Sequence, residues 1–151
     1  MNKLEILKRC HLLRELNDEQ LNELAELCCT KTFEVGERLT TQGKIQEKLY
    51  LIEDGLVGIY LELGPMYKRQ LQSAANFEIV GWSAMVRPYR CSASVIAIEK
   101  TEVLSFDGKE LLDLCFSNPQ LGCKISRGLA SVISLRLYNA YTQLMGVTSQ
   151  D

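Results

Sequence analysis

Between residues 30 and 106, short apolar stretches alternate with glycine and with turn-forming pairs. Residues 57–63 place Val, Ile, Leu and Leu at every second position, which is typical of a half-buried strand. Asp54-Gly55 precedes this stretch and Gly64-Pro65 follows it, and both pairs favour turns. Several short strands at such close spacing indicate a β-roll or barrel and argue against a parallel sheet.

Three hairpins are predicted in this region. Asp54-Gly55 would join a strand at residues 49–52 to the strand at 57–63, because both residues tolerate positive φ. Gly64-Pro65 would then lead to a return strand over residues 68–73. Residues 92–98 and 102–106 would pair around Lys100-Thr101.

Helical signals lie on both sides of the strands. Asn17 and Gln20 have the spacing of a capping box, which predicts a helix that begins at residue 18. Asp107 and Glu110 form a similar cap, and Asn118-Pro119 opens a longer final helix with proline in its first turn.

These elements predict one domain over residues 1–151, mainly β with α. Its N-terminal helical region spans about 1–29, its β-roll about 30–106 and its C-terminal helices about 107–147. The expected fold is a double-stranded, jelly-roll-like β-roll with an N-terminal helix and a long C-terminal dimerisation helix.

The final helix carries an apolar stripe at steps of three and four residues, formed by Leu129, Ile133, Leu137, Ala140, Leu144 and Val147. Such spacing is typical of a coiled-coil seam, although a stripe like this also covers the core of its own subunit in many proteins. We favour a dimer seam for the C-terminal half, because the helix is longer than any roll it could cover.

Composition argues against several classes of protein. The chain of 151 residues has a formal net charge of −2, which gives no support for direct nucleic-acid binding. No apolar run reaches the roughly 20 residues that a membrane helix needs, and residues 1–9 lack a secretory apolar core. We therefore expect a cytoplasmic protein with no membrane segment.

The cysteines and the single histidine bear on chemistry. Cys10, Cys28, Cys29, Cys91, Cys115 and Cys123 form no Cys-x-x-Cys pair, so we expect buried, reduced thiols and no metal site. A metalloenzyme on a β-barrel needs several histidines, and only His11 is present, so we expect no enzyme. A redox or nitrosative sensor is the remaining possibility for Cys91, because Arg90 beside it is cationic.

Residues 79–95 combine features of a phosphate-binding cradle. Gly81 allows close approach of the backbone, and Ser83-Ala84-Met85 can form a short helical turn whose free N–H groups point at an anion. Arg87 and Arg90 add positive charge, and arginine can hold phosphate bidentately. A surface loop with two solvated arginines is the alternative.

This segment resembles the phosphate-binding cassette of the cyclic-nucleotide-binding domain family, of which Crp/Fnr-type sensor domains are members. The family pattern runs Phe-Gly-Glu-x-Ala-Leu and, after a few variable residues, Arg-Ala-Ala-(Ser/Thr)-Val. The upstream run Phe33…Gly36…Leu39…Gly43…Tyr50-x-Ile52-x-x-Gly55 also resembles the family's strand-and-turn signature. The resemblance covers residues 12–144 and implies a regulatory domain that binds an effector such as cAMP, cGMP or a related phosphate-bearing molecule.

The cassette departs from the family pattern at three positions. The family's glutamate, which accepts a hydrogen bond from the ribose 2′-hydroxyl, falls on Trp82, whose indole N–H only donates. The phosphate-binding arginine falls on Cys91, with Arg90 one place early. A family glycine before the cassette falls on Phe77.

The resemblance also selects the remaining candidates. Gly81, Ser83, Ala84 and Ser92 match cassette positions that offer backbone or hydroxyl donors. On the final helix, the pair that contacts the base in the catabolite-activator branch falls on Ala140 and Tyr141; Tyr141 can stack or donate, unless Tyr138 and Tyr141 are ordinary interface aromatics. The candidate ligand-binding residues are Gly81, Trp82, Ser83, Ala84, Arg90, Cys91, Ser92 and Tyr141.

Two functional hypotheses follow. The first is a regulatory domain that acts by effector binding and homodimerisation, with specificity that differs from cAMP binding. The second is a ligandless dimerisation or interaction module. A transcription factor resembles the chain only over its sensor half, since Asp151 follows the final helix closely; we therefore expect no direct DNA binding and allow for a separate output partner.

Overall fold

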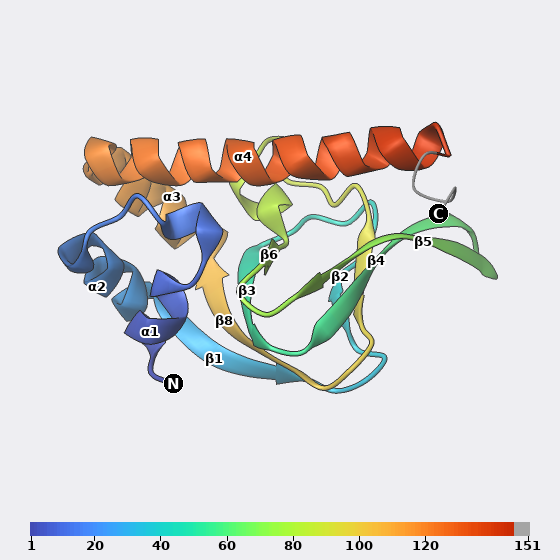
Figure 1. The fold of residues 1–151 in the computed structure, drawn as a ribbon, viewed down its shortest axis with the longest axis horizontal. Coiled ribbons are helices and arrows are strands. Elements are labelled where there is room, and N and C mark those ends of the chain that lie inside the picture. Colours follow the sequence, from blue (N-terminus) through green and yellow to red (C-terminus); the bar gives the residue numbers. More distant parts are fainter. Residues whose placement is uncertain (147–151) are drawn as a thin grey trace.

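Two antiparallel sheets form the centre of the computed structural model, which describes residues 1–146. The first sheet has the order β1 (Cys28–Phe33), β8 (Thr101–Asp107), β3 (Lys48–Asp54) and β6 (Ile79–Val80). The second has the order β2 (Arg38–Thr40), β7 (Ser94–Ala97), β4 (Leu56–Gly64) and β5 (Tyr67–Ala75). The predicted double-stranded β-roll is confirmed (Figure 1).

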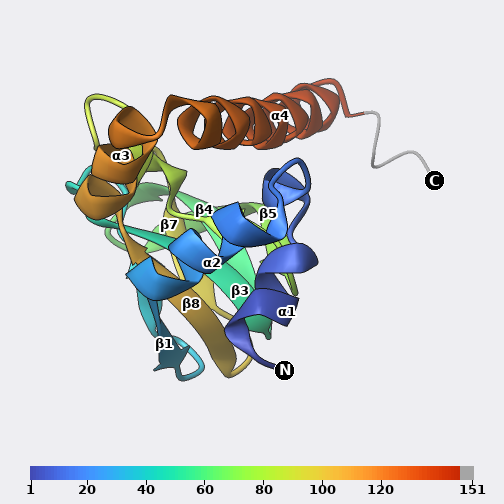
Figure 2. The same ribbon diagram turned by 90° about the vertical axis from the view of Figure 1, so that its left-hand side faces the viewer.

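Strand β3 of the first sheet is buried on both faces, and this accounts for its continuous apolar run. Tyr50 and Ile52 belong to the core between the two sheets, whereas Leu49 and Leu51 belong to a second core beneath the helices. A strand covered on both sides has no polar face, so strict alternation is lost. Figure 2 shows the N-terminal helices packed over this sheet.

The helices begin at caps that the sequence encodes. Helix α2 (Asp18–Leu27) starts with the predicted reciprocal bonds between Asn17 and Gln20. Helix α3 (Gly108–Ser117) is capped by Asp107, and α4 (Pro119–Leu144) by Asn118. The sequence analysis missed α1 (Lys3–Lys8), although Asn2 and Glu5 form a capping box there too, as well as the 3₁₀ turn η1 (His11–Leu13).

Two of the three predicted hairpins are wrong. Strands β4 and β5 do pair around Gly64-Pro65. Strands β3 and β4, on either side of Asp54-Gly55, instead belong to different sheets, and so do β7 and β8 around Lys100-Thr101. At both turns the chain crosses from one sheet to the other. The two turns are in contact, since a Cβ added to Gly55 would clash with Thr101.

Helix α4 covers the core beneath the helices, which contains Leu49 and Leu51 and is called the helix-side core below, with its first half only. Leu121, Ile125 and Leu129 are buried there, whereas Leu137 and Leu144 are exposed. The helix packs closely against η1 at Gly128, where a Cβ would overlap the carbonyl oxygen of Leu12. The predicted stripe is thus split between a buried and an exposed part. Val147 lies outside the described residues, and one domain over residues 1–151 stays a prediction.

All six cysteines are free thiols, but they are not all buried. Cys29 and Cys123 are exposed, because one lies in the solvent-exposed stretch of β1 and the other on the solvent side of α4. Within residues 1–146, no cluster of histidine, cysteine and carboxylate side chains is placed to hold a metal ion. In that same part of the chain, no helix has the length and apolarity needed to cross a bilayer.

Candidate ligand-binding site

The candidate cassette leaves the first sheet at β6 and turns at once into the 3₁₀ helix η2 (Trp82–Met85), the short helix that the sequence predicted. Gly81 joins them with a φ of 80°, a left-handed conformation that favours glycine. A Cβ at this position would lie 2.7 Å from the carbonyl oxygen of Lys48. Glycine is therefore needed for the backbone itself, before any ligand is considered.

A cavity of about 260 Å³ lies beside η2, between the cassette, the second sheet and α4. In Figure 1, α4 crosses above the roll with η2 beneath it. The residues that line the cavity are Thr40, Ile59, Leu71, Gln72, Val80, Gly81, Trp82, Ser83, Cys91, Ser92, Ala93, Val95 and Arg136.

Five of the eight predicted site residues meet at this cavity: Gly81, Trp82, Ser83, Cys91 and Ser92. The other three are not among its lining residues. Ala84 is buried on another side of η2, where its carbonyl oxygen lies 2.7 Å from the place of a Cβ on Gly108 of α3. Tyr141 lies in the last turns of α4 with 58% of its surface exposed.

Arg90 is directed along the surface. Its Nη1 donates to the carbonyl oxygen of Gly43 at 2.9 Å, and its backbone pairs with Ile45. Arg87 is exposed as well, and neither arginine lines the cavity. To reach a ligand there, Arg90 would have to give up its bond to Gly43, so its role stays a prediction.

Cys91 occupies the family's arginine position as a buried thiol. Its Sγ donates to Oε1 of Gln46 at 3.3 Å, and Nε2 of Gln46 donates to the carbonyl oxygen of Lys48 at 2.7 Å. Burial raises the pKa of the Cys91 thiol, and hydrogen bonding with Thr40 offsets this only in part. Because the thiolate is the reactive form, this environment disfavours the redox-sensor interpretation.

Arg136 on α4 is a site residue that the sequence analysis missed. Its Nη2 donates to the carbonyl oxygen of Ile79 at 2.7 Å, and its own carbonyl oxygen accepts from Nε2 of Gln72 at 3.1 Å. Burial lowers the pKa of its guanidinium. A signal did exist, since Arg136 follows Ile133 by three residues and so shares the helix face that turns toward the core.

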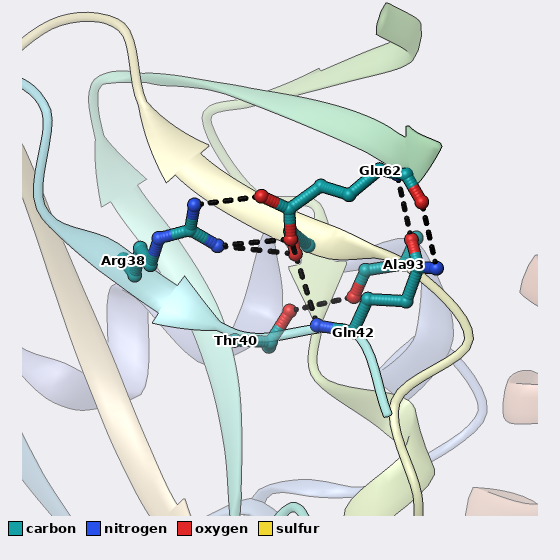
Figure 3. A network of polar contacts seen from close by, with 6 residues as sticks. Arg38, Thr40, Gln42, Glu62 and Ala93 are labelled. Atoms are coloured by element: carbon teal, nitrogen blue, oxygen red, sulfur yellow. Dashed lines mark hydrogen bonds and ion pairs between the residues drawn. The ribbon is translucent and has the colours of Figure 1, made fainter. Parts of the chain in front are cut away.

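A polar network joins β2, β4 and β7 next to the cavity (Figure 3). Arg38 donates both Nη1 and Nη2 to the carboxylate of Glu62, at 3.1 and 2.8 Å. The hydroxyl of Ser94 donates to the same carboxylate and accepts from the backbone N–H of Gln42. These bonds lower the pKa of Glu62 to about 2.

The network continues into the lining of the cavity. The side-chain amide of Gln42 exchanges two hydrogen bonds with the backbone of Glu62 on β4. The hydroxyl of Thr40 on β2 donates to the carbonyl oxygen of Ala93, at 3.1 Å. Since Thr40 and Ala93 both line the cavity, this network fixes the position of its wall.

Comparison with known proteins shows to which family the roll and the cassette turn belong. The sequence model of the cyclic nucleotide-binding domain matches residues 30–118, which is more than half of the chain. This chain belongs to the cyclic nucleotide-binding domain family, so the resemblance inferred from the cassette is confirmed.

Relatives and solved structures place the similarity over the same region. The regulatory subunit of cAMP-dependent protein kinase from Candida albicans is 30% identical over 100 residues, covering 66% of this chain and 21% of the relative. A cyclic nucleotide-binding domain from Methylobacillus flagellatus superposes with a TM-score of 0.81 at 22% identity, over 95% of this chain and 80% of the other. The catabolite activator protein of Thermus thermophilus gives 0.74 at 23% identity, over 91% and 62%.

The two structural similarities concern the fold alone at these identities. The chain spans between 11% and 28% of the length of the curated relatives that it matches. The relatives therefore carry large additional regions that this sequence does not match.

Proposed function

We propose that this chain is a regulatory domain that binds a cyclic nucleotide, or a related phosphate-bearing anion, in the cavity beside η2. The observation that carries the proposal is the convergence of five cassette residues and a guanidinium on one 260 Å³ cavity. Ligand pockets in proteins typically measure about 300–1,000 Å³, so this cavity lies just below the range for a compact effector.

The ligand specificity proposed for this site differs from that of cAMP-binding domains that carry the family's cassette residues. Trp82 stands where the family has a glutamate, and none of the residues that line the cavity carries a carboxylate. The ribose 2′-hydroxyl then lacks its charged acceptor, and Cys91 removes a guanidinium from the phosphate side. Losing one charge-assisted contact costs about 1.5–3 kcal/mol, or roughly ten- to a hundredfold in affinity.

A thermal-shift panel of cAMP, cGMP, 2′-deoxy-cAMP and cyclic dinucleotides tests this proposal. A ligand that binds only the folded state stabilises it by about 2.7 kcal/mol at a hundred times its dissociation constant. We expect at least one compound to raise the melting temperature, and we expect cAMP and its 2′-deoxy form to act equally.

A matched pair of variants ties the shift to the cavity. Ser92→Trp places a large side chain at the cavity wall and should abolish the shift, whereas Ser73→Trp on the exposed part of β5 should keep it. Failure of every compound to stabilise the wild type at millimolar concentration would contradict ligand binding and favour the ligandless dimerisation module.

We also propose that the domain works as a homodimer and passes ligand occupancy to an output partner, without catalysing a reaction or contacting DNA itself. Leu137, Tyr138, Tyr141 and Leu144 on the second half of α4 are all exposed, which supports a dimer surface there. In this proposal, Tyr141 would contact the ligand from the dimer surface. The free thiols support a reducing, cytoplasmic location.

A further inference from the structure

Among the residues that line the cavity, Arg136 alone carries a charge. The other polar side-chain groups there are hydroxyls, one thiol, the amide of Gln72 and the indole N–H of Trp82. The cavity therefore presents one cation and no anion to whatever enters it. That cation comes from α4 and not from the cassette.

Among the residues that the structure describes, no carboxylate forms an ion pair with the guanidinium of Arg136. Glu78 is near enough to favour the charged form electrostatically, but its side chain is exposed and accepts from the backbone N–H of Ala75 instead. Of the five N–H donors of the guanidinium, the bond to Ile79 uses one.

The charge of Arg136 favours the binding of an anion in the cavity. Burial lowers the pKa of Arg136, although arginine stays protonated at neutral pH. A partly desolvated charge without a counter-ion is costly, and an anion that enters the cavity removes that cost. Nη2 of Arg136 donates to the carbonyl oxygen of Ile79, and the backbone carbonyl oxygen of Arg136 accepts from the side chain of Gln72. These two bonds hold Arg136 at the cavity wall.

We propose that Arg136 binds the negatively charged group of the ligand, in place of the cassette arginine that Cys91 has replaced. This inference rests on the proposed function and adds the class of ligand: a small molecule whose anionic group faces α4. The phosphate of a cyclic nucleotide would then lie between Arg136 and the hydroxyls of Ser83 and Ser92.

The test compares cAMP with adenosine, which shares the base and ribose but lacks the phosphate. Isothermal titration at low ionic strength gives the ratio of their affinities for each variant. We expect the wild type to prefer cAMP, and Arg136→Gln to lower that ratio by about tenfold or more. Arg127→Gln, an exposed position on the same helix, should leave the ratio unchanged.

A second variant protects the test against misfolding. Arg136→Met keeps the aliphatic stem and removes the charge, so it should pack and should show the same loss of preference. An unchanged ratio in folded Arg136→Gln or Arg136→Met would overturn the role of Arg136 while ligand binding itself stands. If the wild type binds another nucleotide of the thermal-shift panel instead, that compound and its nucleoside replace cAMP and adenosine in the comparison. A wild type that binds no compound of the panel would refute the proposed function and this inference together.

Discussion

Phe77 adopts a backbone conformation that suits glycine. Its φ is 70°, and the family's glycine was expected at this position from the sequence. The ring is held by Arg9, whose guanidinium carbon lies 4.2 Å from the ring centre, and by contact with the helix-side core. Side-chain packing therefore compensates for a backbone conformation that costs about 1–2 kcal/mol in a residue other than glycine.

Two substitutions at Phe77 separate packing from backbone strain. Both Phe77→Ala and Phe77→Gly lose the contact with Arg9, but only glycine relieves the positive φ. We expect both to be less stable than the wild type, with Phe77→Gly more stable than Phe77→Ala by about 1 kcal/mol in urea unfolding.

Phe116 provides the control, because it lies exposed in α3. In a helix alanine is favoured, so Phe116→Ala should be more stable than Phe116→Gly by about 1 kcal/mol. Finding alanine favoured at both positions would show that Phe77 carries no strain.

The candidate site could be predicted from the sequence where one local segment encodes it. Gly81, Ser83 and Ser92 are close together along the chain, so a pattern of residues locates them. The direction of Arg90 depends on a loop 47 residues earlier, where the carbonyl oxygen of Gly43 accepts its hydrogen bond. Arg136 reaches the site from another element altogether, and that contact requires the packed fold.

Strands β2, β4 and β7 are joined at one end of the second sheet by the network around Glu62. The pKa of Glu62 falls from its ordinary value of 4.5 to about 2 because Arg38 and Ser94 stabilise the carboxylate. A carboxylate whose pKa is lower in the folded protein than in the unfolded chain stabilises the fold at pH values above its unfolded pKa. This contribution disappears as the carboxylate is protonated.

The corresponding prediction concerns acid stability. The urea midpoint of the wild type should exceed that of Glu62→Gln above pH 4.5, and the difference should shrink steadily as the pH falls from 4.5 to 2. Using the difference between the two proteins removes the contribution of the other carboxylates. A difference that stays constant down to pH 2 would show that the charge of Glu62 contributes nothing.

Helices α2, α3 and α4 and five of the strands could be predicted from the sequence, but the sheet to which each strand belongs could not. Caps at Asn17, Asp107 and Asn118 are local, and the structure contains all three. A turn such as Asp54-Gly55 needs positive φ both in a hairpin and in a corner between sheets. The choice is made by packing, here by the contact between Gly55 and Thr101.

The whole molecule exposes apolar surface on the half of α4 that extends past the helix-side core. Leu137 is 50% exposed, Tyr141 58% and Leu144 84%. In a two-fold symmetric pair the same patch is buried twice, so one substitution acts at two places.

Sedimentation equilibrium would test this surface. We expect the wild type to dimerise, and Leu144→Asp to weaken the dimer by about a hundredfold, since burying two leucines contributes about 3 kcal/mol or more. Val35→Asp, at another exposed apolar residue that is remote from α4 in the sequence, should leave the dimer intact. A wild type that stays monomeric at high concentration would contradict the proposed interface.

The contact between Ala84 and Gly108 has a mechanical consequence. The space between η2 and the first residue of α3 is too small for a single methyl group. Helix α3 therefore leaves η2 no free space on the side where Ala84 faces Gly108. We therefore expect a shift of η2 toward α3 to displace α3 as well.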